Sequence, residues 1–180
     1  LRLYKEGSRE IHYRIDTTGG YGAGPADALR GDLGAPLRDK YGEDNVKIID
    51  VTFNSTKDVR DPSVYADKIT ELYGVTGDLF EAGVLKIVNP SAKLEQDLTG
   101  RKWEDNYANG QHRKKIEAKD KFKSQFGHSP DHGDGFVLAA VPPEVFGIQS
   151  QVEYLLTPAH LDTAMSLGCT WDNPAGVSTL

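Results

Sequence analysis

Asp16 is the first residue whose type and position could do chemistry. It closes an alternating apolar and polar run at residues 11–15, typical of a strand, and a glycine-rich turn follows at residues 17–24. A carboxylate at the carboxyl end of such a strand projects into the crevice where α/β sheets bind ligands. The glycines leave room for a bulky partner. The alternative is that Asp16 only begins a turn, or caps a helix that we expect to start at Pro25.

Asp131 and Asp134 form a second acidic motif, directly before an apolar run at residues 136–141 that predicts a buried helix. Residues three apart lie on the same side of a first helical turn. Two carboxylates are costly to bury there unless a cation compensates them, and Mg²⁺ is usually held by one or two carboxylates plus substrate phosphate. The alternative is a set of first-turn acids that the helix dipole favours without any metal.

Several other chemistries find no support. Proline replaces the third glycine of a dinucleotide fingerprint at Pro25, and no Gly-Lys-Ser or Gly-Lys-Thr follows that could form a P-loop. Cys169 is the single cysteine, and His128 and His132 have no partners at zinc-finger spacing. Ser129 lacks the surroundings of a nucleophile elbow. A nucleotide cradle, a structural zinc site and a serine triad are therefore all disfavoured.

The charge distribution is uneven. The 180 residues carry a formal net charge of -6, and residues 142–180 contain no Lys or Arg. Residues 113–123 are instead rich in Lys and Arg, and this short strip could face phosphate. The cations of this strip that we expect to contact phosphate are Arg113, Lys119, Lys121 and Lys123. The alternative is a solvated strand and turn with no partner.

The remaining pattern predicts one α/β domain at residues 1–141 and a tail at residues 142–180. Further strands are expected at residues 46–53 and 84–88. One helix is expected to begin within residues 61–64 and to continue to residue 80, and Gly83 closes it. A shorter helix is expected at residues 93–98. Asn109-Gly110 predicts a hairpin between strands at residues 102–107 and 111–117.

Two observations bear on the setting of the chain. No stretch approaches eighteen consecutive apolar residues, so we expect no transmembrane helix and no membrane partner. The chain begins at Leu1 without an initiator methionine or a signal segment, and we expect it to be a piece of a longer or processed protein.

Four segments in this order resemble the nuclease domain of tailed-phage large terminases. They are residues 15–29, residues 65–68 followed by residues 79–87, residues 116–123 and residues 127–139. The second resembles the family's next helix and short strand, the third its closing hairpin, and the last its final acidic helix. The resemblance implies an RNase H-like fold, with a central mixed sheet flanked by helices. The first strands of that fold would be absent from this chain.

The resemblance also implies an activity, namely metal-dependent cleavage of concatemeric viral double-stranded DNA during genome packaging into the prohead. Two Mg²⁺ or Mn²⁺ ions would be held by a carboxylate cluster with Asp16 as its second acid, Asp134 as its third and Asp131 as a neighbouring ligand. The first acid would precede Leu1. The family's last motif reads Asp-Ala-Leu, whereas this chain has Asp134-Gly135-Phe136.

The implied partners are double-stranded DNA and, through the full-length protein, the portal protein and the small terminase subunit. The implied location is the host cell cytoplasm. Two alternatives remain open at this point. One is a non-catalytic DNA- or portal-docking module on the same fold, and the other is a different RNase H-like nuclease such as a resolvase.

Overall fold

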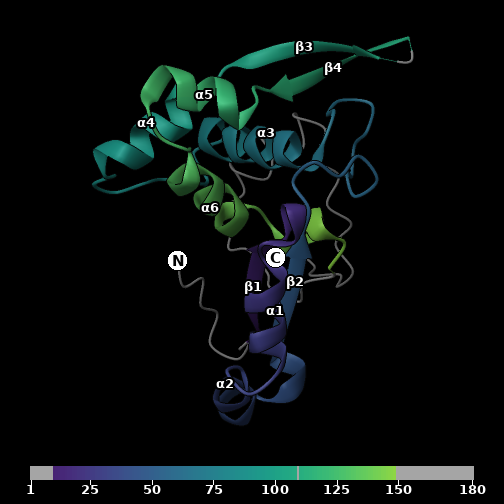
Figure 1. The fold of residues 1–180 in the computed structure, drawn as a ribbon, viewed down its shortest axis with the longest axis vertical. Coiled ribbons are helices and arrows are strands. Elements are labelled where there is room, and N and C mark those ends of the chain that lie inside the picture. The colour runs from purple at the N-terminus through teal and green to yellow at the C-terminus, as the bar shows by residue number, and fades with distance from the viewer. Residues whose placement is uncertain (1–9, 109, 149–180) are drawn as a thin grey trace, which may run out of the picture.

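The computed structural model describes residues 10–108 and 110–148, and it shows helices packed around two small sheets (Figure 1). The protein is therefore a mixed α/β structure, as predicted. No helix within the described ranges is long and apolar enough to cross a membrane. Asn109 of the predicted turn and the predicted tail from residue 149 onward lie outside these ranges.

The first sheet pairs β1 (Ile11–Asp16) with β2 (Val46–Val51) in parallel, with Asp16 opposite Val51. Both strands are close to their predicted positions because their residues alternate or are β-branched. The connection contains α1 (Ala23–Arg30), which contacts β2, and α2 (Ala35–Tyr41). Short 3₁₀ turns lie at Thr18–Gly20 and Glu43–Asn45. In Figure 1 these elements form the lower half of the molecule.

The glycine turn after β1 has a specific steric reason. A Cβ atom on Gly22 would lie 2.0 Å from the backbone oxygen of Asp16, so only glycine allows the chain to fold back this closely. The backbone N–H of Thr18 donates to Oδ1 of Asp16 at 2.9 Å. The turn therefore holds the Asp16 carboxylate at the end of the strand.

The helix α3 (Lys68–Glu81) begins later than predicted. The side chain of Asp67 caps it by accepting from the backbone N–H of Thr70 at 3.1 Å. The residues before Asp67 are drawn into backbone pairing with the later hairpin, where Ala66 N–H donates to Lys114 O and Lys114 N–H to Val64 O. This long-range pairing leaves residues 61–64 outside the helix.

The strand predicted at residues 84–88 is wrong, because none forms there in the structure. The backbone N–H groups of Val84 and Leu85 both donate to Leu79 O at the end of α3. Apolar and β-branched composition favours a strand only where a partner supplies hydrogen bonds. The next element is α4 (Ala92–Gly100), which is longer than the short helix predicted at residues 93–98.

The hairpin of β3 (Trp103–Ala108) and β4 (Gln111–Ile116) is confirmed as antiparallel. Gly110 has φ of 78°, the left-handed conformation that the predicted turn requires. After the hairpin comes α5 (Lys119–Phe126), a helix that the sequence analysis did not expect, since residues 116–123 resemble a closing hairpin and the alternative was a solvated strand and turn. Phe122 and Phe126 lie four residues apart, and their ring centroids are separated by 4.5 Å. This spacing places both rings on one apolar face of a helix, which favours a helix here over a strand.

The central mixed sheet of an RNase H-like fold is not confirmed. Within residues 10–108 and 110–148, the strands form two separate two-stranded sheets, one parallel and one antiparallel. Figure 1 shows the β3–β4 hairpin at the top of the molecule and the β1–β2 pair in the lower half, with helices between them. The two strand pairs are therefore not joined by hydrogen bonds into one sheet.

The last described helix, α6 (Asp131–Ala140), starts five residues before the predicted apolar run and ends just before Pro142, as predicted. A 3₁₀ turn at Pro143–Phe146 follows it. The core lies where α3, α6 and this turn meet β2 and β4. Its buried members are Val51, Phe53, Ile69, Leu72, Tyr73, Ile116, Val137, Leu138, Val141 and Val145. Residues 142–146 thus pack against the body of the domain, and the predicted boundary at residue 141 stays a prediction.

Candidate functional site

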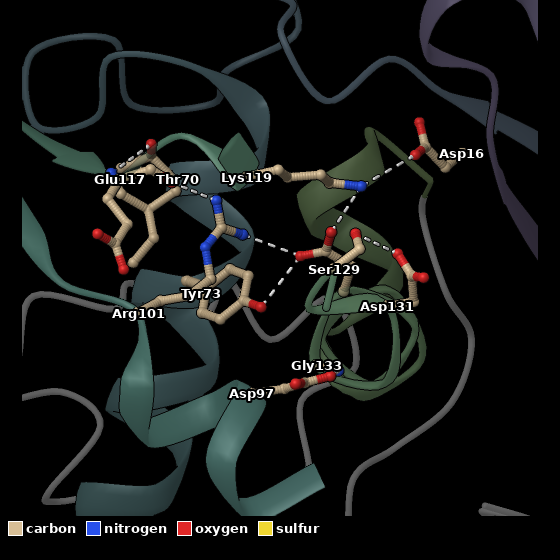
Figure 2. Close-up of polar contacts among 12 residues, drawn as sticks. Asp16, Thr70, Tyr73, Asp97, Arg101, Glu117, Lys119, Ser129, Asp131 and Gly133 are labelled. Carbon is tan, nitrogen blue, oxygen red and sulfur yellow. Dashed lines mark hydrogen bonds and ion pairs between the residues drawn. The ribbon is translucent and has the colours of Figure 1, made fainter. Parts of the chain in front are cut away.

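Asp134 lies in the first turn of α6 and is only 3% exposed. Its Oδ1 atom accepts from Nη1 of Arg101 at 2.9 Å and from the hydroxyl of Tyr73 at 3.0 Å. Its Oδ2 atom lies 2.8 Å from Nζ of Lys119. Three side chains from three different segments therefore converge on this single buried carboxylate (Figure 2).

Asp16 approaches the same lysine from the end of β1. Its Oδ2 atom lies 4.0 Å from Nζ of Lys119, and its side chain is about one-third exposed. Lys119 is the first residue of α5. Its ammonium group lies between two acids that are far apart in the sequence (Figure 2). The structure brings together two of the three predicted acids and places a cation between them. Their catalytic role stays a prediction.

Asp131 occupies the predicted turn but points elsewhere. It is exposed, and its Oδ1 atom accepts from the hydroxyl of Ser129 at 2.6 Å. Only one of the two acids of this turn, Asp134, is therefore buried. Asp131 and Asp134 are three apart, yet only Asp134 faces the neighbouring helices, because α6 turns its Asp131 side toward solvent.

The residues present can be compared with the ligand needs of a divalent ion. In the described ranges no group of three or more His, Cys, Asp or Glu side chains is arranged to hold a metal. Oδ2 of Asp134 has no hydrogen-bond partner there, although Lys119 lies at ion-pair distance. The ammonium therefore approaches this oxygen without hydrogen-bond geometry. Asp16 and Asp134 suit one Mg²⁺ that also binds substrate phosphate, and two ions would need further ligands.

The four cations predicted to contact DNA do not share one face. Lys119 turns toward Asp134, while Lys121 is paired with Glu104 at 2.5 Å. Lys121 and Lys123 are both exposed on α5, but residues two apart on a helix point in different directions. Arg113 lies on the hairpin strand β4. The helix α5 turns Lys121 and Lys123 in different directions, and the contact of these four cations with DNA stays a prediction.

Comparison with known proteins gives little at the level of sequence. No protein-family model matches the chain, and no curated protein does. Among solved structures, the chain is similar to the nuclease domain of the large terminase subunit gp2 of bacterial virus Sf6, with 18% identity and a TM-score of 0.45. The match covers 73% of this chain and 65% of that one. It is too distant to assign a function.

Two residues of the site carry no sequence signal. Arg101 stands between α4 and β3, and its Nη2 donates to the backbone oxygen of Glu117 while Nη1 holds Asp134. Tyr73 belongs to the apolar side of α3 and reads as an ordinary core residue. Burial raises the pKa of the Tyr73 phenol above its ordinary value, and the charge of Asp134 adds to the rise. The phenol therefore stays protonated and donates to Asp134.

Asp97 is a third residue that the sequence did not single out. It lies on α4, is fully buried, and its Oδ2 atom accepts from the backbone N–H groups of His132 and Gly133 at 3.0 and 3.1 Å. Pro130, at the N-cap of α6, makes no side-chain cap. Asp97 thus caps α6 from a neighbouring helix and helps to fix the turn that carries Asp134.

Proposed function

We propose that this chain is a nuclease domain that hydrolyses double-stranded DNA with the help of Mg²⁺ or Mn²⁺. One observation carries the proposal: Asp16 and Asp134, on separate elements, lie 4.0 and 2.8 Å from the same ammonium group. Two carboxylates that share one ammonium group can also share one divalent ion that lies close to where the ammonium lies now. The terminase-like motifs around both acids support the same chemistry.

Asp16 and Asp134 would hold the ion. When bound, the ion supplies the Lewis acidity that phosphodiester hydrolysis needs. The chain's own groups prepare the site for it. Arg101 and Tyr73 hold Oδ1 of Asp134, which leaves Oδ2 directed at the cation. Lys119 is 41% exposed and can swing toward a phosphate oxygen of the DNA backbone.

The wider part of the proposal follows the resemblance. The substrate would be concatemeric viral DNA, cut during packaging in the host cell cytoplasm, and the longer protein would contact the portal protein and the small terminase subunit. A second ion would use a first acid located before Leu1. Asp131, in the same turn, remains a proposed neighbouring ligand.

Asp16→Asn is the sharpest test. Asp16 is partly exposed, its contact with Lys119 is long, and an asparagine oxygen can still accept from the backbone N–H of Thr18, so the variant should fold. We expect the longer protein that contains the upstream acid to nick a plasmid in Mn²⁺, and Asp16→Asn to abolish nicking and weaken Mn²⁺ binding measured by calorimetry. Asp120→Asn, an exposed acid beside Lys119, is the control that should cut normally. Normal cutting by folded Asp16→Asn would refute the assignment.

Asp134→Asn tests the same assignment less directly, because this substitution also changes the stability of the fold. It removes the charge that compensates Arg101 and Lys119, and an uncompensated buried charge costs about 3–5 kcal/mol. We expect this variant to lose cleavage, and also to unfold at a lower urea concentration than Asp16→Asn. Equal urea midpoints for the two variants would contradict the burial argument.

A second function, a non-catalytic DNA-docking module, is favoured by one specific observation. Asp134 is already neutralised by Arg101 and Lys119, and no third acid joins it in the part of the chain that the structure describes. The same experiment separates the two. A longer protein that binds double-stranded DNA in a gel-shift assay but leaves it intact in Mn²⁺ would support the module and reject the nuclease.

A further inference from the structure

Oδ2 of Asp134 is the oxygen that a divalent ion would have to reach, and it is closed off from solvent. Arg101 and Tyr73 hold the other oxygen, Oδ1. The ammonium group of Lys119 lies 2.8 Å from Oδ2, although no hydrogen bond to this oxygen forms among the described residues. Oδ2 is therefore covered by an ion-pair contact and not by a hydrogen bond.

Of the two cations that contact Asp134 in the described ranges, Lys119 is the one that can leave without disturbing the core. Its side chain is 41% exposed, and its ammonium also lies 4.0 Å from Oδ2 of Asp16, whose side chain is about one-third exposed (Figure 2). The side chain of Arg101 is only 2% exposed, and its Nη2 donates to the backbone oxygen of Glu117. The route from solvent to Oδ2 of Asp134 therefore passes the ammonium of Lys119.

An ammonium group and a divalent ion cannot both contact this oxygen from the same side. Mg²⁺ binds a carboxylate oxygen at about 2.0–2.1 Å, which is closer than the ammonium lies. A lysine ammonium has three N–H donors and no acceptor, so it cannot itself be a ligand of the ion. The two cations also repel each other, most strongly where water is excluded. Occupancy by one therefore lowers the affinity for the other.

We propose that Lys119 is a built-in competitor of the divalent ion. Its ammonium covers Oδ2 of Asp134, and the side chain swings toward solvent when the ion binds the acid pair. This inference rests on the nuclease function proposed above and adds to it a control on metal binding. The apparent affinity for the ion is lowered by the fraction of molecules in which the ammonium has swung out. An open fraction of about one tenth weakens binding about ten-fold.

The first test measures Mn²⁺ binding to the full chain by calorimetry. Lys119→Ala removes the competing ammonium, and it should fold because Arg101 and Tyr73 still hold Oδ1 of Asp134. We expect this variant to bind Mn²⁺ about ten-fold more tightly than the wild type. The control is Lys93→Ala, which removes an exposed lysine from the first turn of α4 and should change the affinity by less than about two-fold, because salt screens surface charges. Equal or weaker Mn²⁺ binding by Lys119→Ala would overturn the proposal.

A second variant keeps this test decisive if circular dichroism shows that Lys119→Ala does not fold. Lys119→Gln removes the charge, and its amide N–H can still donate to Oδ2 of Asp134. A neutral donor competes less with the ion than an ammonium does, so we expect Lys119→Gln to bind Mn²⁺ several-fold more tightly than the wild type. A folded Lys119→Gln without this gain would contradict the competition.

The second test observes the ammonium of Lys119 directly, in the nitrogen NMR spectrum of the lysine side chains. Its signal is identified by its loss in Lys119→Ala. We expect this signal to shift as Mg²⁺ is added, while the signal of Lys93 stays in place. Calorimetry on the same sample shows whether the ion has bound.

The outcomes separate this inference from the function on which it rests. A bound ion with an unchanged Lys119 signal would refute the displacement and leave the nuclease function standing. Failure of both the wild type and Lys119→Ala to bind Mg²⁺ or Mn²⁺ would reject the metal site, and with it both proposals.

Discussion

At the residue scale, the central feature is a buried carboxylate whose two oxygens have different neighbours. Oδ1 of Asp134 accepts from Arg101 and from Tyr73, whereas Oδ2 faces Lys119. Arg101 also lies over the Tyr73 ring at 4.8 Å, so these residues form one network. The network holds the Asp134 carboxylate in one orientation, as either candidate function of the acid pair requires.

Tyr73 gives this network a pH signature. Its pKa is raised above the ordinary value of 10.0, mainly by burial. Above pH 10 the unfolded chain therefore loses a phenol proton that the native chain keeps, and the free energy of unfolding falls by up to about 1.4 kcal/mol per pH unit. Urea unfolding at several alkaline pH values should show this fall, and Tyr73→Phe should have a shallower one. Identical slopes would show that Tyr73 contributes no pH dependence.

At the element scale, the position of α6 depends on close contact with α4. Asp97 of α4 caps α6, and Gly133 lies at the crossing. A Cβ atom on Gly133 would lie 2.8 Å from the Tyr73 hydroxyl and 2.9 Å from Cβ of Asp97. The absence of a side chain at Gly133 lets the turn that carries Asp134 pack against both α3 and α4.

Two glycines of α6 provide a matched pair of variants. Gly133→Ala should lower the free energy of unfolding by about 1–3 kcal/mol, because the added methyl group overpacks the crossing. Gly135→Ala meets open space on the exposed side and should raise it by up to about 1 kcal/mol. Urea midpoints measure both. A stabilised Gly133→Ala, or a strongly destabilised Gly135→Ala, would contradict the packing described here.

At the scale of the whole molecule, a buried ion pair ties distant segments to α3. Nζ of Lys68 donates to Glu71 at 2.6 Å, to the Asp58 backbone oxygen at 2.9 Å and to that of Val145 at 2.5 Å. Arg14 of β1 donates to the backbone oxygen of Val141. These bonds join β1, the end of α6, the last 3₁₀ turn and α3 into one body.

Lys68→Met should be strongly destabilising, by about 3–5 kcal/mol, because Glu71 then keeps a buried charge without a partner. The double variant Lys68→Met/Glu71→Gln removes both charges. The amide oxygen that it introduces can still accept from the backbone N–H of Arg60, as the Glu71 carboxylate does at 2.7 Å. We expect the double variant to recover a large part of the loss in urea unfolding. A double variant less stable than Lys68→Met would show that the charge of Glu71 is compensated elsewhere.

The sequence by itself determined the features that depend on neighbouring residues. These are the strand that ends at Asp16, the hairpin around Gly110, and the helical turn that holds Asp131 and Asp134. Each follows from local periodicity, turn chemistry or helix geometry. The same local reasoning failed at residues 84–88, where the backbone bonds to the end of α3 instead of to a strand, and at α5, where a phenylalanine pair favoured a helix.

Only the tertiary structure decided which of the acids share a cation, and which residues surround Asp134. Arg101, Tyr73 and Lys119 come from separate segments, and no spacing in the sequence links them to Asp134. It also decided that Asp131 faces solvent. The physical reason is that such contacts arise from how helices pack across the core. Sequence patterns describe only interactions between residues that are close together in the chain.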